Sequence, residues 1–238
     1  CKYTYMSGNI YEGDLKNGMI EGHGKMTYID GDVYIGNWEN NKYNGTGQKT
    51  FISGKKYSGN FKNGLMEGYG EMLYINGDIY KGKFINGKIE GDGELIAKRG
   101  PIYKGHFMNR EFKGKKTCKN GDIYEGEFKD NIILGKCKKT FRNGTIYEGE
   151  FKDNIIQGKG KWIYKCGDIY EGEFKNDKFD GIGKWIYKSG NIYEGEFKNG
   201  KLEGKGKYTF TNGCIYEGEF KNGKFEGKGK LTCANGDI

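Results

Sequence analysis

Aromatic and polar residues alternate along short stretches of this chain. In residues 193–197, which read Tyr-Glu-Gly-Glu-Phe, two rings and a glycine alternate with two carboxylates. Successive side chains of a β-strand point to opposite faces, so this pattern places the rings on one face and the carboxylates on the other. A second alternating stretch covers residues 204–208, and Asn-Gly at 199–200 lies between the two. Two such stretches around Asn-Gly predict a β-hairpin.

This hairpin pattern repeats along the whole chain. A Tyr-x-Gly triplet occurs ten times, and successive triplets lie 23 residues apart except for one interval of 21. An aromatic residue stands four positions after each Tyr except at Leu15, and a Gly stands eleven positions after every Tyr. Another Gly follows two positions later in eight repeats, with Lys116 and Cys137 in the other two. The tyrosines are Tyr11, Tyr34, Tyr57, Tyr80, Tyr103, Tyr124, Tyr147, Tyr170, Tyr193 and Tyr216.

The repeated unit, G-D-I-Y-E-G-E-F-K-N-G-K-x-E-G-K-G-K-x-x-Y-x-N, resembles the MORN repeat (membrane occupation and recognition nexus). The resemblance covers ten successive units, so we expect one repeat array over residues 1–238, with an irregular 21-residue repeat at 103–123. Because the chain lacks an initiator Met and opens in mid-repeat, we expect it to be a fragment of a longer protein. The expected fold is all-β: an elongated, twisted antiparallel sheet of about ten successive 23-residue hairpins that forms an open, solenoid-like ribbon.

The two faces of the sheet are expected to differ. Glycines on the ring-bearing face should leave hollows in which aromatic rings lie flat. On the opposite face, Glu on first strands should oppose Lys on second strands, each pair contributing about 0.2–1 kcal/mol. In the irregular repeat two residues are missing from the second strand and Lys116 stands at a glycine position. We therefore predict disturbed ring stacking and a local change in the ribbon's direction there.

Composition narrows the class of protein. Gly accounts for 44 of 238 residues, Pro for one, and aromatic residues supply nearly half of the apolar side chains. The chain has no apolar run approaching the roughly 20 residues that span a bilayer. It has only two His, and its six Cys form no C-x-x-C pair. We expect no enzymatic activity, no required cofactor, and a cytoplasmic protein at the cytoskeleton or at the cytoplasmic face of a membrane.

Positive charge is concentrated in the irregular repeat. Residues 98–119 contain eight basic residues and one acid, and so carry +7 of the chain's formal +8. Two interpretations stay open: solvated lysines of a degenerate repeat, or a contact for anionic phospholipids or an acidic protein. Nucleic acid is not expected, because the rings are used in the repeat core and no binding motif is present. The candidate contact residues are Arg99, Lys104, Arg110, Lys113, Lys115 and Lys116.

Two cysteines occupy unusual positions in the last hairpin. Cys214 replaces a usual Asp or Asn, and Cys233 replaces an aromatic residue. Pairing each Phe with the Gly seven residues further on would place these cysteines opposite each other. One interpretation is a small buried pair. The other is half of a tetrahedral zinc site that a two-fold homodimer would complete, with an intermolecular disulfide expected only as an oxidised artefact.

The resemblance implies a function beyond the fold. MORN-only proteins similar to this chain organise cytoskeletal structures in protozoan parasites, and the family is associated with phosphoinositides, protein contacts and dimerisation. We therefore expect a non-enzymatic scaffold that self-associates as a homodimer and binds cytoskeletal or membrane-linked proteins. The first alternative is a direct phospholipid-binding module. The second is a regulatory array of a fused enzyme outside this fragment.

Overall fold

The computed structural model describes residues 1–233, in which every regular element is a β-strand. The chain forms two compact units, residues 1–119 and 120–238. Unit 1 contains β1 (Lys2–Thr4), β2 (Ile10–Lys16), β3 (Met19–Thr27), β4 (Val33–Glu39), β5 (Lys42–Thr50), β6 (Lys56–Lys62), β7 (Leu65–Leu73), β8 (Ile79–Ile85), β9 (Lys88–Ile96), β10 (Ile102–Met108) and β11 (Glu111–Thr117). Unit 2 contains β12 (Ile123–Lys129), β13 (Ile132–Thr140), β14 (Ile146–Lys152), β15 (Ile155–Ile163), β16 (Ile169–Lys175), β17 (Lys178–Ile186), β18 (Ile192–Lys198), β19 (Lys201–Thr209), β20 (Ile215–Lys221) and β21 (Lys224–Thr232).

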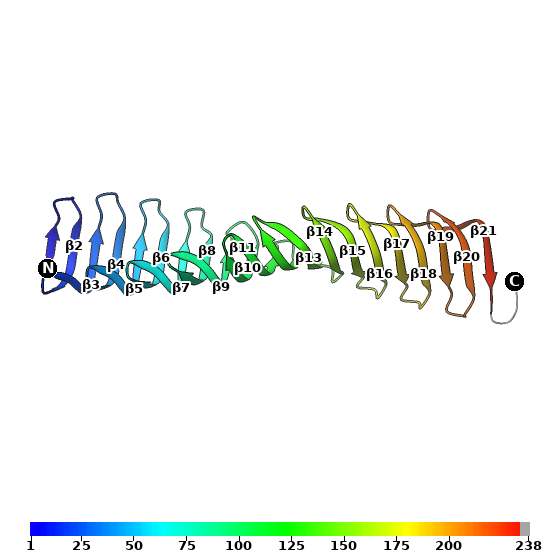
Figure 1. Ribbon diagram of the computed structural model, residues 1–238, viewed down its shortest axis with the longest axis horizontal. Helices are drawn as coiled ribbons and strands as arrows, with labels where there is room; N and C mark the ends of the chain where they lie inside the picture. Colours follow the sequence, from blue (N-terminus) through cyan, green and yellow to red (C-terminus); the bar gives the residue numbers. More distant parts are fainter. Residues whose placement is uncertain (234–238) are drawn as a thin grey trace. The chain divides into compact units, whose positions relative to one another are not determined.

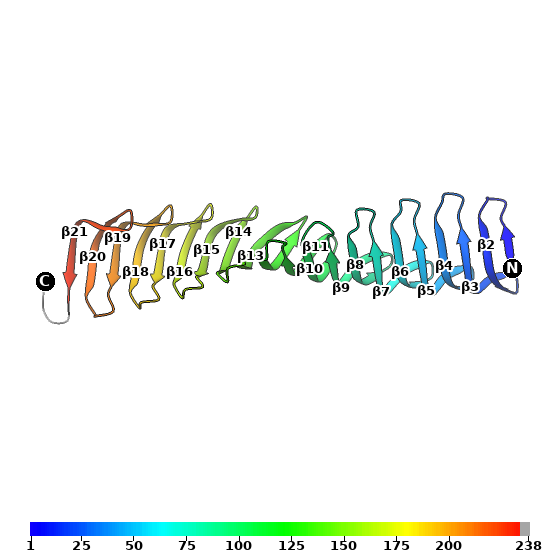
Figure 2. The same ribbon diagram turned by 180° about the vertical axis from the view of Figure 1, so that it is seen from behind.

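Within each unit, consecutive strands pair in antiparallel fashion and the hairpins follow one another in chain order (Figure 1). The same succession is visible from behind (Figure 2). The predicted all-β fold of successive antiparallel hairpins is therefore confirmed. In the described part of the chain, no helix is long and apolar enough to cross a membrane.

Two-residue turns join the strands of each hairpin. Asn199 and Gly200 have φ angles of 52° and 84°, and the corresponding pairs in the other repeats also have positive φ. Positive φ at both turn residues is the type I′ geometry that Asn-Gly favours. Where Gly is replaced, Asn or Asp usually takes its place, as at Asn154 and Asp177, since these side chains tolerate the left-handed region.

A β-bulge interrupts the 23-residue hairpins. In β18–β19, Gly195 pairs with Gly206 but Phe197 pairs with Leu202, so the second strand holds two extra residues between these pairs. Gly204 lies in the bulge with a φ of 62°. This explains the Gly eleven positions after the Tyr of each 23-residue repeat, because L side chains rarely adopt that conformation. The sequence-based pairing of each Phe with the Gly seven residues on is wrong, because the bulge moves the partner to the fifth residue.

Glycines that lie opposite each other on the two strands of a hairpin, such as Gly195 and Gly206, form the expected hollow. A Cβ on Gly206 would lie 2.5 Å from the Tyr193 ring, and one on Gly195 would meet the Tyr193 hydroxyl at 2.5 Å. The ring therefore lies directly on the paired glycines, where its hydroxyl donates a hydrogen bond to the Glu196 carbonyl at 2.9 Å. Seven tyrosines of this kind are fully buried: Tyr11, Tyr34, Tyr57, Tyr80, Tyr147, Tyr170 and Tyr193.

Edge-to-face contacts connect the rings of neighbouring repeats. The Tyr80 ring lies 5.4 Å from Phe84 of its own repeat and 5.3 Å from Phe107 of the next, with interplanar angles of 84° and 87°. Aromatic pairs prefer this geometry, which adds about 0.5–1.5 kcal/mol per pair to area burial. The core is thus a row of interlocked rings rather than an aliphatic interior.

A side-chain hydrogen bond closes the open end of many hairpins. The Asp168 Oδ1 accepts from the Lys188 N–H at 2.7 Å, across the base of β16–β17. We call this an Asx clamp: an Asp or Asn two residues before the repeat Tyr that accepts from a backbone N–H twenty residues later. Within residues 1–233, six hairpins have it, through Asn9, Asp32, Asp78, Asp122, Asp168 and Asn191.

The irregular repeat lacks the bulge. In β10–β11, Gly105 pairs with Gly114 and Phe107 pairs with Phe112 without a shift in register. The two missing residues are therefore those that form the bulge elsewhere. Gly114 takes the place opposite Gly105, so the prediction that Lys116 occupies a glycine hollow is wrong. Lys116 pairs instead with Tyr103, and its Nζ lies 5.6 Å from the centre of that ring. The predicted change of direction at this repeat stays a prediction.

Candidate functional site

Charged side chains on the polar face form regular ladders. In unit 2, Lys161 pairs with Glu171 at 3.6 Å and Lys184 with Glu194 at 2.9 Å, each joining the second strand of one hairpin to the first strand of the next. Lys138 and Glu148 do the same at 3.0 Å. The predicted opposition of first-strand Glu and second-strand Lys is therefore confirmed here. Such exposed pairs contribute about 0–1 kcal/mol each, so their main effect is to neutralise the face.

The order of charges is reversed in part of unit 1. Lys81 stands on a first strand and contacts Glu71 of the preceding second strand at 2.9 Å. Further along, Glu94 on β9 pairs in register with Lys81 on one side and Lys104 on the other. The predicted order is thus wrong for these repeats, although opposite charges still face each other.

The alternation breaks at the irregular repeat. On the polar face of β10–β11, Lys104 lies opposite Lys115, and His106 lies opposite Lys113. We call these four residues the basic square. All four side chains are exposed. Lys104 and Lys115 carry like charges, and like charges placed directly across a sheet repel one another.

Acidic residues of β9 lie beside the first strand of the basic square. On β9, Glu94 lies opposite Lys104, and the Asp92 carboxylate lies 3.1 Å from Nδ1 of His106. These two acids balance much of the charge on β10.

The structure brings together three of the six predicted contact residues: Lys104, Lys113 and Lys115. Arg99 lies in the turn between β9 and β10, and Arg110 lies in the turn between β10 and β11 with a φ of 67°. Lys116 lies on the ring-bearing face, beside Tyr103, whose pKa is raised first by burial and then by Cys118. Sequence reasoning missed His106, although its spacing of two from Lys104 places both on one strand face.

A separate groove of about 910 Å³ runs along the polar face of unit 2. Six Glu and five Lys side chains from successive repeats line it, together with strand glycines. Ile182, 60% exposed, stands where the neighbouring repeats carry Lys159 and Lys205. The paired charges resemble a neutral binding face more than an acid–base couple, because each carboxylate belongs to the same repeating ladder.

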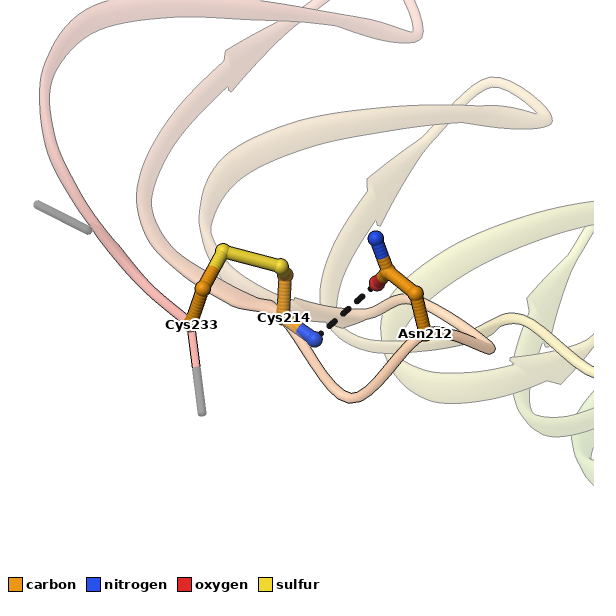
Figure 3. The surroundings of a disulfide bond; sticks show 3 residues. All are labelled: Asn212, Cys214 and Cys233. Carbon is orange, nitrogen blue, oxygen red and sulfur yellow. Dashed lines mark hydrogen bonds between the residues drawn. A yellow bond between two sulfur atoms is a disulfide. The ribbon is translucent and has the colours of Figure 1, made fainter. Parts of the chain in front are cut away.

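The predicted proximity of the two unusual cysteines is confirmed. Cys214 and Cys233 form a disulfide within one chain, at the base of the β20–β21 hairpin, with Cα atoms 4.1 Å apart (Figure 3). Within residues 1–233, no group of three or more His, Cys, Asp and Glu is arranged to hold a metal ion. A zinc site shared by two chains would require both thiolates in reduced form. That site and the homodimer stay predictions.

Solved structures with some similarity to this chain include TCP domains of CPAP proteins. The TCP10 domain of CPAP from Danio rerio is 10% identical with a TM-score of 0.37, over 92% of this chain and 94% of that one. The TCP domain of SAS-4 (dCPAP) of Drosophila melanogaster, solved with a proline-rich motif of Ana2 (dSTIL), is 12% identical with a TM-score of 0.33, over 83% and 90%. We draw nothing about partners from similarity at this level. No curated protein matches the chain.

The sequence itself matches a family description over most of its length. Nine segments match the model described as MORN repeat: residues 11–33, 34–56, 57–79, 80–99, 124–146, 147–168, 170–192, 193–215 and 216–238. The irregular repeat at 103–123, which lacks the bulge, lies between two of these segments. With well over half of its residues matched, this chain belongs to the MORN repeat family.

Proposed function

We propose that this chain is a non-enzymatic scaffold whose repeat array self-associates and binds cytoskeletal or membrane-linked partners. The repeated side chains support this proposal because their contacts stabilise the sheet. The tyrosine hydroxyls bind backbone carbonyls, and the Glu and Lys side chains pair across strands. No nucleophile with an adjacent base is needed to explain any of these residues.

The observation that carries the proposal is the basic square. At the equivalent position of each hairpin in unit 2, Glu lies opposite Lys, as Glu194 does with Lys207, whereas Lys104 lies opposite Lys115 across β10–β11. A partner surface rich in Asp and Glu would relieve this repulsion. Such contacts between exposed charges weaken with salt, because the Debye length is only about 8 Å at physiological ionic strength.

A charge-reversal variant tests the proposal. The triple variant Lys104→Glu, Lys113→Glu, Lys115→Glu should lose binding to a detergent-insoluble cytoskeletal fraction in a sedimentation assay. The matched control is Lys152→Glu, Lys175→Glu, Lys198→Glu, which changes net charge equally at exposed strand ends outside the basic square. The control should sediment like the unmodified chain. Equal sedimentation of both variants with the unmodified chain would contradict the proposal.

The same variants separate the scaffold from a phospholipid-binding module, which the lysines of the basic square also favour. Vesicles of phosphatidylcholine with phosphatidylserine would be the probe, at low and at physiological salt. A scaffold should bind them only at low salt. Binding that persists at physiological salt and is lost in the Lys104, Lys113 and Lys115 variant would establish the lipid module instead.

Self-association is tested by light scattering on the intact chain under reducing conditions with and without zinc. The proposal predicts the mass of a dimer, and zinc should increase the dimer fraction if thiolates of two chains share the metal. The variant Cys214→Ser, Cys233→Ser should then lose the response to zinc. A monomer at all concentrations would exclude the homodimer.

A further inference from the structure

The last hairpin keeps the loop geometry of the others but not their Asx clamp. The Cys214 N–H donates to Asn212 Oδ1 at 3.0 Å, just as the Asp122 N–H donates to Asn120 Oδ1 at 3.0 Å (Figure 3). The Cys214 carbonyl accepts from the Phe210 N–H at 2.9 Å, as the Asn191 carbonyl does from Tyr187. The backbone is therefore unchanged, and only the side chain that would close the hairpin base differs.

Both ends of that base are substituted together. Cys214 stands at the Asx position before β20, and Cys233 stands directly after β21, where the preceding repeats have Phe210 and Tyr187. The neighbouring residues Ile215 and Thr232 are paired in register, which brings the two cysteines to the same place. The disulfide therefore joins the two chain segments that an Asx clamp joins in six other hairpins.

We propose that the Cys214–Cys233 disulfide is a redox-dependent clamp that replaces the Asx clamp in the last hairpin. In the oxidised chain the hairpin base is closed covalently. In the reduced chain neither the disulfide nor an Asp or Asn at position 214 holds it. Because a disulfide has no thiolates, closure of the clamp and metal binding by these two sulfurs exclude each other. This inference does not depend on the scaffold function.

The chemistry is thiol–disulfide exchange with a small disulfide such as oxidised glutathione. One cysteine thiolate attacks that disulfide and releases one small thiol, and the second cysteine then displaces the other. The S–S bond of the oxidant is reduced as the bond between Cys214 and Cys233 forms. Two electrons pass from the protein to the oxidant, and the two thiol protons are balanced in the two small thiols released.

The last hairpin is where such a clamp has the largest effect. Among the described strands β21 pairs with β20, and it is exposed along its whole length. Contacts of the Phe225 ring, 4.4 Å from Tyr216 and 5.3 Å from Phe220, are its main link to the aromatic row. Strands inside unit 2, in contrast, pair on both sides, so β21 depends more on closure of its hairpin base.

Hydrogen exchange on the intact chain tests the clamp. The protein is equilibrated with oxidised glutathione or with dithiothreitol, and the thiols are counted by alkylation and mass spectrometry. Closing a loop of this length restricts the opened chain, so amides of 215–232 should exchange about tenfold or more slowly in the oxidised form. Amides of β18 and β19 should not change. The Cys214→Ser, Cys233→Ser variant should exchange fast under both conditions.

A second variant restores the clamp of the other repeats. Cys214→Asp with Cys233→Tyr should exchange slowly under both conditions, since an Asx clamp does not respond to thiols. Three results would overturn the proposal: two free thiols after oxidation, a disulfide between chains rather than within one, or equal exchange rates of 215–232 in the oxidised and reduced chain.

Discussion

The two glycines of each Gly-x-Gly segment have different physical roles. Gly158 lies in a bulge with a φ of 80°, so its backbone conformation excludes most side chains. Gly160 has no such φ, but a Cβ there would lie 2.6 Å from the Tyr147 ring. One glycine is required by the backbone and the other by the ring that lies on it.

Adding a single methyl group should therefore be costly at the ring contact. We expect Gly160→Ala to destabilise unit 2 by about 3 kcal/mol, because neither the ring nor the paired strand can move without strain. The control is Gly200→Ala, a turn position with a φ of 84° and no atom within 4 Å of the new Cβ, which should lose about 1 kcal/mol. Urea unfolding midpoints measure both. Equal losses would contradict the ring-contact role.

The buried tyrosines predict a loss of stability in alkali. Burial raises the pKa of Tyr57, Tyr80 and Tyr193 to about 12. Above pH 10 the unfolded chain releases these protons while the folded chain keeps them. Stability that is fully present below pH 10 should therefore fall as the pH rises towards 12.

Far-ultraviolet circular dichroism during an alkaline titration measures this loss. Tyr80→Phe keeps the ring, removes the ionisable group and gives up the hydrogen bond to the Lys83 carbonyl. This variant should be less stable at neutral pH but lose less stability between pH 10 and 12. An identical alkaline loss in the variant would show that Tyr80 does not contribute.

At the scale of the hairpin, the alternating pattern was sufficient to predict strands, turns and the ring-bearing face. The bulge was not predicted, because a glycine required for its φ and a glycine required for a hollow look the same in the sequence. A pattern without the bulge predicts the wrong partner for Phe220, although it correctly predicts that Cys214 and Cys233 lie opposite each other. Their pairing depends on the register beyond the bulge, which the Tyr216–Leu231 pair preserves.

The basic square was only partly predicted for the same reason. Counting positions placed Lys116 at a glycine site, because nothing in the spacing told whether the two missing residues came from a strand or from a bulge. Once the bulge is removed, Lys116 changes its structural position and pairs with Tyr103. The sequence shows that Glu71 stands on a second strand and Lys81 on a first strand, the reverse of the usual order. Only the strand register shows that Lys104 and Lys115 then lie opposite each other.

An Asx clamp predicts how one hairpin responds to acid. The Asp32 carboxylate accepts from the Ile52 N–H and pairs with Lys49, both at 2.9 Å. Burial alone would raise its pKa, but the N–H and the ammonium group outweigh burial and lower it. Its contribution is therefore present above the ordinary carboxyl pKa of about 4 and is lost as the pH falls through the lower folded value.

The variant Asp32→Asn separates the charge from the hydrogen bond, since an amide oxygen still accepts from Ile52. At neutral pH it should be about 1 kcal/mol less stable than the unmodified chain, and this difference should shrink below about pH 4. Chemical denaturation at several pH values measures the difference. A difference that does not depend on pH would contradict the assignment to the carboxylate charge.

At the scale of the whole molecule, each unit contains its own strand pairing and its own aromatic row. Repeat proteins gain stability mainly from neighbouring repeats, so each unit should fold without the other. We expect residues 1–119 and 120–238, expressed separately, to give β-rich circular dichroism and cooperative thermal unfolding. The control division, between Asn176 and Asp177, splits the β16–β17 hairpin and should give less stable pieces. Unfolded 120–238 alone would contradict the prediction.

The charge ladders also limit what a partner can distinguish. Within unit 2, a partner that moves by one repeat, about 10 Å along the sheet, meets nearly the same charges and backbone again. A periodic surface of this kind can bind a partner without fixing where along the array that partner lies. The position of a partner can be fixed only by residues that depart from the repeat, such as the basic square in unit 1 and Ile182 and the cysteine pair in unit 2. The irregular residues would then determine where along the array a partner binds. Changing one of them should shift that position without preventing the chain from folding.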